Sequence, residues 1–266
     1  MREFTGFESW IRRHYKVYRF VRKSAPFLCK YLILEDGFDF LNHISCSTGY
    51  LALDIGANDG TSIRMIRKFL PEVQIVAFDP VTKPKFKLVN VEFQDIALGS
   101  AFTTNQIYTP IVRGHELTQY SSFYKEKVTD QLVHDLGISE SEVSYNQRDT
   151  NVVTLDSLNM TPFFIKIDVE GFEREVILGS LKTIKMHRPV ILIEIQSIQR
   201  FNEMQSVLAT IGYLPIKTSP SSNLNSKGFS LNRIQSYDPT VNNYIWIPDS
   251  GSDAWGFKRV GRSNTP

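Results

Sequence analysis

The stretch YLALDIGANDGTSIRMIRKFLPEVQIVAFDP, residues 50–80, decides the fold class of this chain. It begins with an apolar run that ends at Asp54, continues through the glycine-containing turn 56–60 into a helical pattern, and reaches a second apolar run that ends at Asp79. A strand, a tight turn, a helix and a second strand in this order are one unit of an α/β protein with a parallel sheet. Ligands of such sheets bind beyond the carboxyl ends of the strands, so the turn between the two carboxylates predicts a ligand site.

The same alternation of strands and helices continues along the chain. Helical patterns predict helices within 60–71, 170–184 and 197–213, and apolar runs predict the strands between them. The predicted strands are 50–54, 74–79, 91–98, 163–168, 190–195 and 243–248. Because near-continuous apolar strands are typical of sheets that are covered on both faces, the sequence predicts a doubly wound, mostly parallel α/β domain.

Two polar stretches interrupt this pattern and predict long loops. Residues 103–150 are rich in Thr, Ser, Gln and Tyr, and residues 217–240 are rich in Ser, Asn and Pro. We expect the second loop to shape a substrate pocket, because long loops in compact domains are often functional. The predicted organisation is an N-terminal helical extension (1–48), the α/β domain (49–250) and a C-terminal tail (251–266).

Composition and charge limit the classes of function. An apolar content of 42% and a charged content of 22% are ordinary for a globular protein and exclude a mainly disordered chain. The net charge is only +2, but residues 1–30 hold eight Lys or Arg, which alternate with aromatic residues. This segment is either a solvated helix that packs on the domain or a basic helix that contacts an anionic surface such as a membrane. One such helix does not indicate nucleic-acid binding, and we expect none.

Cysteine usage and hydropathy indicate a cytoplasmic protein. Cys29 and Cys46 are too few and too loosely spaced for a disulfide framework or a zinc site. No apolar run approaches the roughly 20 residues that a membrane-spanning helix needs, and the N-terminus lacks the apolar region of a signal peptide. We therefore expect a cytoplasmic protein that contacts membranes at most peripherally.

The turn after the first strand indicates the kind of ligand. Its sequence, GANDG, lacks the GxGxxG pattern that holds the pyrophosphate of a nicotinamide dinucleotide, which disfavours an oxidoreductase. Asp54 and Asp59 would repel a phosphate, but they favour a ligand with a cationic amine or free hydroxyl groups. Asp79 is placed to accept both hydroxyl groups of a ribose. S-adenosylmethionine, an amino acid joined to a nucleoside, meets these requirements.

Six motifs extend this interpretation: LDIGANDG, FDP, IALG, TLDSL, FIKIDVEGFEREVILGS and RPVILIEIQ. In order and spacing they resemble the FkbM family of S-adenosylmethionine-dependent methyltransferases over residues 50–215. The resemblance implies a seven-stranded, Rossmann-like class I methyltransferase fold. It also implies cofactor contacts from Asp54, Gly56, Ala57, Asn58 and Gly60 to the methionine part, from Asp79 to the ribose, and from Asp95, Ile96 and Ala97 to the adenine. The alternative for Asp95 is that it does not contact adenine and is an exposed acid at a strand end.

Methyl transfer to a hydroxyl group requires that the acceptor be aligned and lose a proton. Asp168 ends the strand 163–168 and faces the same cleft as Asp54, where it could act as a base, bind an acceptor hydroxyl or ligate a metal. Glu170 opens the next helix, and Lys166 points to the same face as Asp168, where it either stabilises the anion or caps the strand end. Asp168 and Glu194, at the ends of neighbouring strands, either share a divalent cation such as Mg²⁺ or Mn²⁺ or simply accept hydrogen bonds from substrate hydroxyls.

The polar stretch 103–150 and one strand add further site residues, each with an ordinary alternative. His115 and His134 are general-base candidates or solvated histidines. The residues Ser121, Ser122 and Phe123 stand where the family has a serine pair, and we interpret them as a lid. Trp246 suits stacking on a sugar ring, or packs in the core.

The sequence thus predicts a methyltransferase that acts on a hydroxyl group of a saccharide or another polyhydroxylated metabolite. The alternatives are N- or C-methylation of a small molecule, and a nonenzymatic module that binds the cofactor or a partner protein. The expected partners are a small-molecule or glycan acceptor and, through the basic N-terminal segment, a membrane surface or a glycosyltransferase.

Overall fold

The computed structural model describes residues 37–44, 49–84, 89–220, 229–239 and 241–249. These residues fall into two compact units. The main unit contains the described residues up to Thr104 and from Asn151 onward, and the inserted unit contains residues 105–150. The predicted N-terminal extension, apart from residues 37–44, and the predicted tail 251–266 lie outside the described residues, as do Cys29 and Cys46 and the basic segment 1–30.

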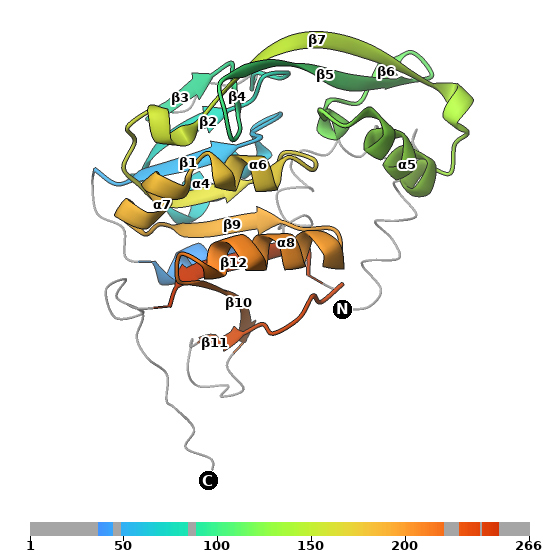
Figure 1. Cartoon of the computed structure of the whole chain (residues 1–266). Helices are drawn as coiled ribbons and strands as arrows, with labels where there is room; N and C mark the ends of the chain where they lie inside the picture. The colour runs from blue at the N-terminus through green and yellow to red at the C-terminus, as the bar shows by residue number, and fades with distance from the viewer. Residues whose placement is uncertain (1–36, 45–48, 85–88, 221–228, 240, 250–266) are drawn as a thin grey trace. The chain divides into compact units, whose positions relative to one another are not determined.

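The main unit contains an eight-stranded sheet, in which the strands follow the order β11-β10-β12-β9-β8-β1-β2-β3 (Figure 1). The bounds are β1 Leu51–Ile55, β2 Gln74–Phe78, β3 Val91–Gln94, β8 Pro162–Ile167, β9 Val190–Glu194, β10 Tyr213–Pro220, β11 Phe229–Arg233 and β12 Asn243–Pro248. Neighbours from β3 to β9 pair in parallel, whereas β12 pairs antiparallel with both β9 and β10, and β11 pairs antiparallel with β10. The sheet is therefore mixed and has one strand more than the seven expected.

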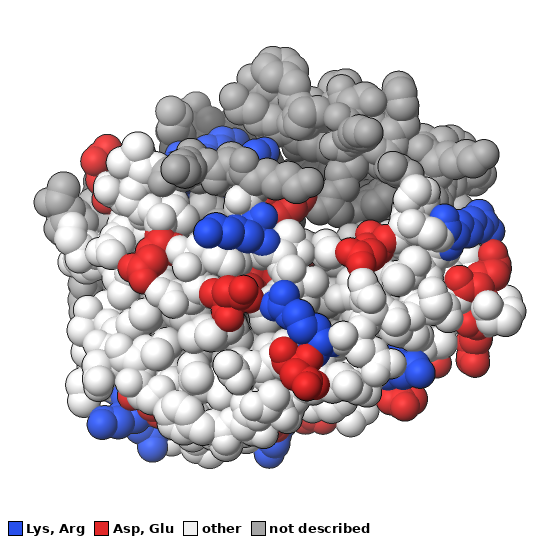
Figure 2. Space-filling view, turned by 90° about the horizontal axis from the view of Figure 1, so that it is seen from above, with Lys and Arg blue, Asp and Glu red and all other residues white. Residues whose placement is uncertain are grey.

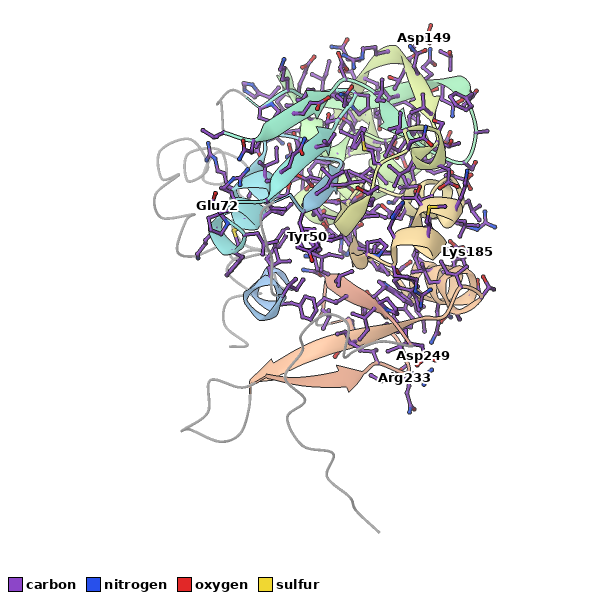
Figure 3. All side chains as sticks on the ribbon, turned by 90° about the vertical axis from the view of Figure 1, so that its left-hand side faces the viewer. Tyr50, Glu72, Asp149, Lys185, Arg233 and Asp249 are labelled. Atoms are coloured by element: carbon purple, nitrogen blue, oxygen red, sulfur yellow. The ribbon has the colours of Figure 1, made fainter. Side chains whose placement is uncertain are left out.

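Helices cover both faces of this sheet. They are α4 Thr61–Phe69, α6 Glu173–Leu178, α7 Leu181–His187 and α8 Ile198–Ala209, with the 3-10 helices η1 Phe38–His43 and η4 Leu155–Ser157. Figure 3 shows Glu72, in the turn after α4, on one side of the sheet and Lys185 of α7 on the other. The α/β class and the doubly wound arrangement of helices agree with the sequence.

The helix predicted within 170–184 is two helices, α6 and α7, that meet at Gly179. A Cβ atom at Gly179 would lie 1.8 Å from the carbonyl oxygen of Gly99, so the chain between the helices touches the backbone of the turn after β4 (Ala97–Leu98). The predicted strand 91–98 is also divided, because β3 belongs to the large sheet and β4 to a second sheet. The turn after β4 therefore packs closely against the chain between α6 and α7.

The two faces of the large sheet have separate cores. On one face, Ala52, Phe164 and Leu192 pack with Ile63 and other residues of α4 and with Phe38 of η1. On the other face, Trp246 is fully buried and its ring lies 5.8 Å from that of Phe201 on α8. Trp246 is therefore a core residue, which confirms the second of its two predicted roles.

The stretch 103–150, predicted as a long polar loop, is ordered secondary structure, and that prediction was wrong. It contains β5 Thr103–Val112, β6 His115–Glu116, η2 Thr118–Tyr120, α5 Lys125–Leu136, η3 Glu140–Glu142 and β7 Val143–Val153. The second sheet has the order β4-β7-β5-β6. A small core of Val112, Leu117, Tyr120, Val128, Leu132 and Ile138 holds the inserted unit together. The start of β5 (TTNQ) and the middle of β7 (NQRDTN) are entirely polar, so their composition resembles that of a loop.

The described residues show two further surface properties. In this part of the chain, no helix combines the length and the apolar character that crossing a bilayer requires. On the face drawn in Figure 2, acidic and basic side chains are interspersed among uncharged ones.

Candidate active site

The carboxyl ends of β1 and β8 meet at one edge of the large sheet. Asp54 is paired in register with Lys166, and Ile55 with Ile167. The residue after β8 continues this pairing, because the backbone N–H of Asp168 donates to the carbonyl oxygen of Ile55 at 2.9 Å. The structure thus brings Asp54, Lys166 and Asp168 together, as the sequence predicts.

The turn after β1 is held tightly against the chain that follows β8. Gly56 has a φ of +86°, and a Cβ atom there would lie 1.7 Å from the carbonyl oxygen of Asp168. The N–H groups of Gly56 and Ala57 donate to the carbonyl oxygen of Phe78 at 2.8 and 3.1 Å. A side chain at Gly56 would therefore separate the turn from β8, so this glycine is required for packing between the two loops as well as for its backbone conformation.

Asp79, at the end of β2, holds the same turn from the other side. Its Oδ2 accepts from the N–H of Asn58 at 2.8 Å, and its Oδ1 accepts from the N–H groups of Val81 and Thr82 at 2.8 and 2.7 Å. Asn58 has a φ of +42°, so this contact stabilises a conformation that a non-glycine residue rarely adopts. The predicted contact of Asp79 with a ribose remains a prediction.

Asp54 is completely buried and accepts a hydrogen bond of 2.5 Å from the hydroxyl group of Ser62 on α4. Sequence reasoning missed Ser62; its position in the first turn after the glycines was the available signal. Asp59 accepts from the N–H and hydroxyl groups of Thr61 at 3.1 and 2.8 Å. Asp59 therefore supports the start of α4, while Gly60, with a φ of +81°, is its N-cap residue.

The residues predicted to contact adenine lie beside Asp79. The N–H of Asp79 donates to the carbonyl oxygen of Gln94, the last residue of β3, at 3.2 Å. Asp95 follows directly and is exposed, Ile96 is half-buried, and Ala97 is buried at the start of β4. These three residues stand at the same edge of the sheet as the turn, and their contact with adenine stays a prediction.

Lys166 is a buried cation in the middle of this edge. Only 2% of the residue is exposed, and its Nζ donates to Oδ2 of Asp168 at 2.7 Å. The Asp168 side chain is 22% exposed, so it lies at the boundary between solvent and the buried residues Asp54 and Lys166. This ion pair supports the prediction that Lys166 stabilises the Asp168 anion.

Glu170 and Gly171 form a tight turn between Asp168 and α6. Glu170 has a φ of +49° and Gly171 a φ of +108°. The N–H of Gly171 donates to Glu173 at 2.7 Å, and Glu173 is paired with Arg200 of α8 at 2.7 Å. Buried contacts between α6 and α8 therefore hold the turn that carries Glu170, whose predicted catalytic role is untested.

Glu194, at the end of β9, experiences several charges. The charge of Asp168 and burial raise its pKa well above the ordinary value, Glu170 raises it further, and Lys166 together with a hydrogen bond from Gln196 lowers it. The principal cause is the like charge of Asp168 on the neighbouring strand. Glu194 and Asp168 are therefore neighbours, as expected from the sequence.

This raised pKa predicts a pH-dependent effect of Glu194→Gln. Between the unfolded-state pKa of glutamate, about 4.3, and the higher folded-state pKa, the folded protein binds more protons than the unfolded chain, so wild-type stability falls as pH rises. The variant lacks this loss. At pH 8 its melting temperature should exceed that of the wild type, by roughly 2–4 °C for each kcal/mol by which its free energy of unfolding is higher. The difference should vanish near pH 4. Glu72→Gln, which removes an exposed carboxylate (Figure 3), is the control. An equal gain in melting temperature at pH 8 and pH 4 would contradict the raised pKa of Glu194.

The predicted metal pair is not supported. Among the described residues, no group of three or more His, Cys, Asp or Glu side chains comes together in a way that could hold a metal ion. Asp168 instead has the Lys166 ammonium group at 2.7 Å. The positive charge of this ammonium group disfavours a divalent cation at the same carboxylate.

The remaining predicted residues belong to the inserted unit. His115 is half-buried on β6, and His134 on α5 is exposed with its Nδ1 3.1 Å from Asp135. Ser121 is hydrogen-bonded to Thr109 at 2.9 Å, and Ser122 accepts from the N–H of Tyr124 at 3.2 Å. The serines thus stabilise the chain before α5; the predicted base and lid functions, including that of Phe123, stay predictions.

Comparison with known proteins identifies the family. A family model described as the methyltransferase FkbM domain matches residues 54–222. No curated protein matches the chain. Among solved structures, methyltransferase FkbM from Methylobacillus flagellatus KT is similar, with 13% identity and a TM-score of 0.44 over 80% of this chain and 48% of that one. This chain therefore spans about half the length of that protein.

Two other solved methyltransferases are similar at lower scores. Precorrin-6y C5,15-methyltransferase from Geobacter metallireducens GS-15 has 12% identity and a TM-score of 0.35, over 82% of this chain and 90% of that one. A 16S rRNA (adenine(1408)-N(1))-methyltransferase variant from Catenulisporales acidiphilia has 11% identity and a TM-score of 0.31, over 79% and 90%.

The matched range begins at Asp54, includes the turn 56–60 and Asp79, and continues through Asp168 and Glu194. The resemblance that the motifs indicate is therefore confirmed over the residues that form the carboxyl edge of the sheet. Because this match spans more than half of the 266 residues, the chain belongs to the FkbM methyltransferase domain family.

Proposed function

We propose that this protein transfers the methyl group of S-adenosylmethionine to a hydroxyl group of a saccharide or another polyhydroxylated metabolite. Membership of the methyltransferase family supports the reaction class. The observation that carries the proposal is the arrangement around the turn 56–60, where Asp54, Asp79 and the chain after β8 meet at one sheet edge. Ligands of parallel sheets bind at this edge.

The residues at this edge fit the cofactor chemically. Carboxylates suit its ammonium group and its two ribose hydroxyls, and a turn with several positive φ angles presents backbone groups rather than side chains. Asp54 and the turn would hold the methionine part, Asp79 the ribose, and the chain 95–97 the adenine. The cofactor supplies an electrophilic methyl group on a sulfonium centre.

Asp168 is the residue best placed to handle the acceptor. Its side chain is 22% exposed, and the ammonium group of Lys166, which donates to Oδ2 at 2.7 Å, orients its carboxylate. In this role, a carboxylate oxygen of Asp168 accepts a hydrogen bond from the acceptor's hydroxyl group. It then takes the proton of that group as the hydroxyl oxygen of the acceptor is methylated. Glu194, on the next strand, offers a second polar group to a neighbouring hydroxyl, which favours a substrate with adjacent hydroxyls.

Two substitutions test the division of roles between cofactor and acceptor. Asp79→Ala removes a charged acceptor and should weaken S-adenosylmethionine binding about 10- to 100-fold. Asp168→Ala should leave that affinity within about threefold while turnover falls at least about 100-fold. Titration calorimetry measures binding, and release of S-adenosylhomocysteine measures turnover. Equal losses of affinity in the two variants would contradict the proposed roles.

The acceptor class is tested by a screen with matched hydroxyl and amine substrates. Neutral methyl glycosides should be methylated, and the corresponding amino compounds should not be preferred. Turnover should persist after exhaustive chelation of divalent cations, because Lys166 supplies the positive charge beside Asp168. Preference for amines would favour N-methylation, and binding of the cofactor without turnover on any acceptor would favour a nonenzymatic role.

A further inference from the structure

Asn243 stands at the proposed methyl-transfer edge although it lies outside the residues that the family model matches, 54–222. It is the first residue of β12, which runs antiparallel to β9. For this reason the beginning of β12, rather than its end, reaches the carboxyl edge of the parallel strands. The register pairs Asn243 directly with Glu194.

The side chains of Asn243 and Glu194 share one face of the sheet. Leu192 and Ile245, paired in register, belong to the same hydrophobic core cluster. Each lies two residues along its strand from Glu194 or Asn243, and residues two apart point to the same face. Directly opposed residues of antiparallel strands have Cβ atoms roughly 4.5–5.5 Å apart. The two polar side chains are therefore immediate neighbours.

Asn243 is buried by a segment that also lies outside the matched range. Only 5% of the residue is exposed. A Cβ atom at Gly37, the N-cap residue of η1, would lie 3.3 Å from Cβ of Asn243 and 2.9 Å from Cδ1 of Leu192. The chain entering η1 thus closes over the end of β12. All residues of β12 are buried. Because a buried amide costs free energy unless it forms hydrogen bonds, Asn243 needs polar neighbours at this position.

We propose that Asn243 is a positioning residue that holds the Glu194 carboxyl group in place at the methyl-transfer edge; this role rests on the proposed function. An amide both donates and accepts hydrogen bonds, so it can hold a carboxyl group without adding a charge. The charged groups that act on Glu194 are Asp168, Glu170 and Lys166, and Gln196 donates to its Oε1 at 3.2 Å. Lys166 thus orients Asp168, and Asn243 orients Glu194 from the opposite strand.

A double-mutant cycle tests the contact without any substrate. Asn243→Asp keeps the shape but places a carboxylate opposite Glu194, so its melting temperature at pH 8 should fall by about 4 °C or more. Glu194→Gln in the same chain should recover most of this fall, because only one carboxylate then remains at the pair. Asn242→Asp, at the exposed neighbouring position, is the matched control and should show no coupling to Glu194→Gln. Additive effects of Asn243→Asp and Glu194→Gln would overturn the proposal.

A second measurement separates positioning from simple packing. With S-adenosylmethionine and neutral methyl glycosides, Asn243→Ala should keep its cofactor affinity within about threefold and lose turnover about tenfold. Asn243→Ser, which retains a donor and an acceptor, should recover part of the turnover. Unchanged turnover in Asn243→Ala would overturn the positioning role of Asn243 but leave the proposed function standing. Failure of the wild-type protein to bind S-adenosylmethionine would instead overturn the proposed function, and this role with it.

Discussion

Gly56→Ala should lower the free energy of unfolding by more than about 4 kcal/mol, at the upper end of the range for single substitutions. The new Cβ atom would lie 1.7 Å from a backbone carbonyl oxygen, that of Asp168, which no rotamer change can remove. The φ of +86° adds strain of about 1–2 kcal/mol. Because proteins are stable by only about 5–15 kcal/mol, we expect most of the variant to be unfolded or insoluble.

Gly114→Ala is the matched control for this substitution. Gly114 also has a positive φ, +76°, but a Cβ atom placed there would have no atom of the described residues within 4 Å. It should therefore lose only the strain contribution, about 1–2 kcal/mol. Guanidinium chloride unfolding followed by circular dichroism compares the two variants. If Gly56→Ala unfolds within about 1 kcal/mol of Gly114→Ala, the close approach of the two loops is not what constrains this position.

Lys166→Met should be the second most damaging substitution. It leaves Asp168, Glu194 and Asp54 at the same edge without their buried cation, and loss of one partner of a buried pair costs about 3–5 kcal/mol. Because the Asp168 side chain is 22% exposed, we expect about 2–3 kcal/mol at pH 8. The loss should shrink as pH falls, since the raised pKa of Glu194 would rise further without Lys166 and the carboxyl group would bind a proton.

Two comparisons identify the cause of the Lys166→Met effect. Lys185→Met, at an exposed lysine on α7 (Figure 3), should change stability by less than about 0.5 kcal/mol. Adding Asp168→Asn to Lys166→Met should recover part of the loss, because the unpaired carboxylate is then removed. Unfolding by denaturant at pH 8 and pH 5 measures all four chains. A double variant that is less stable than Lys166→Met would show that lost packing, not the unpaired charge, dominates.

The sequence was most informative where strands are buried on both faces. All six residues of β8 are buried, and its continuous apolar pattern marks the strand directly. The same logic placed Asp54, Asp79 and Asp168 at one edge, because the ends of parallel strands coincide. It failed for β5 and β7, which contain the polar runs TTNQ and NQRDTN and resemble a polar loop in composition.

Other parts of the site depend on tertiary contacts that no local pattern records. Gly56 looks like a ligand-binding glycine, and only the structure shows that the carbonyl of Asp168 occupies the place of its side chain. Asn243 was missed because the site was sought at strand ends, whereas an antiparallel strand contributes its beginning. Ser62 lies on a helix and reaches Asp54 only after α4 packs on the sheet.

The way in which residues 105–150 join the rest of the chain affects how this protein can evolve. The chain leaves the main unit along β5 and returns along β7, and the hydroxyl of Thr104 lies 3.4 Å from the side-chain oxygen of Asn151, so departure and return are adjacent. A segment with adjacent ends can be lengthened, shortened or exchanged with little effect on the strands that carry Asp54 and Asp79. Selection can therefore remodel this segment while the chemistry at the sheet edge is inherited unchanged.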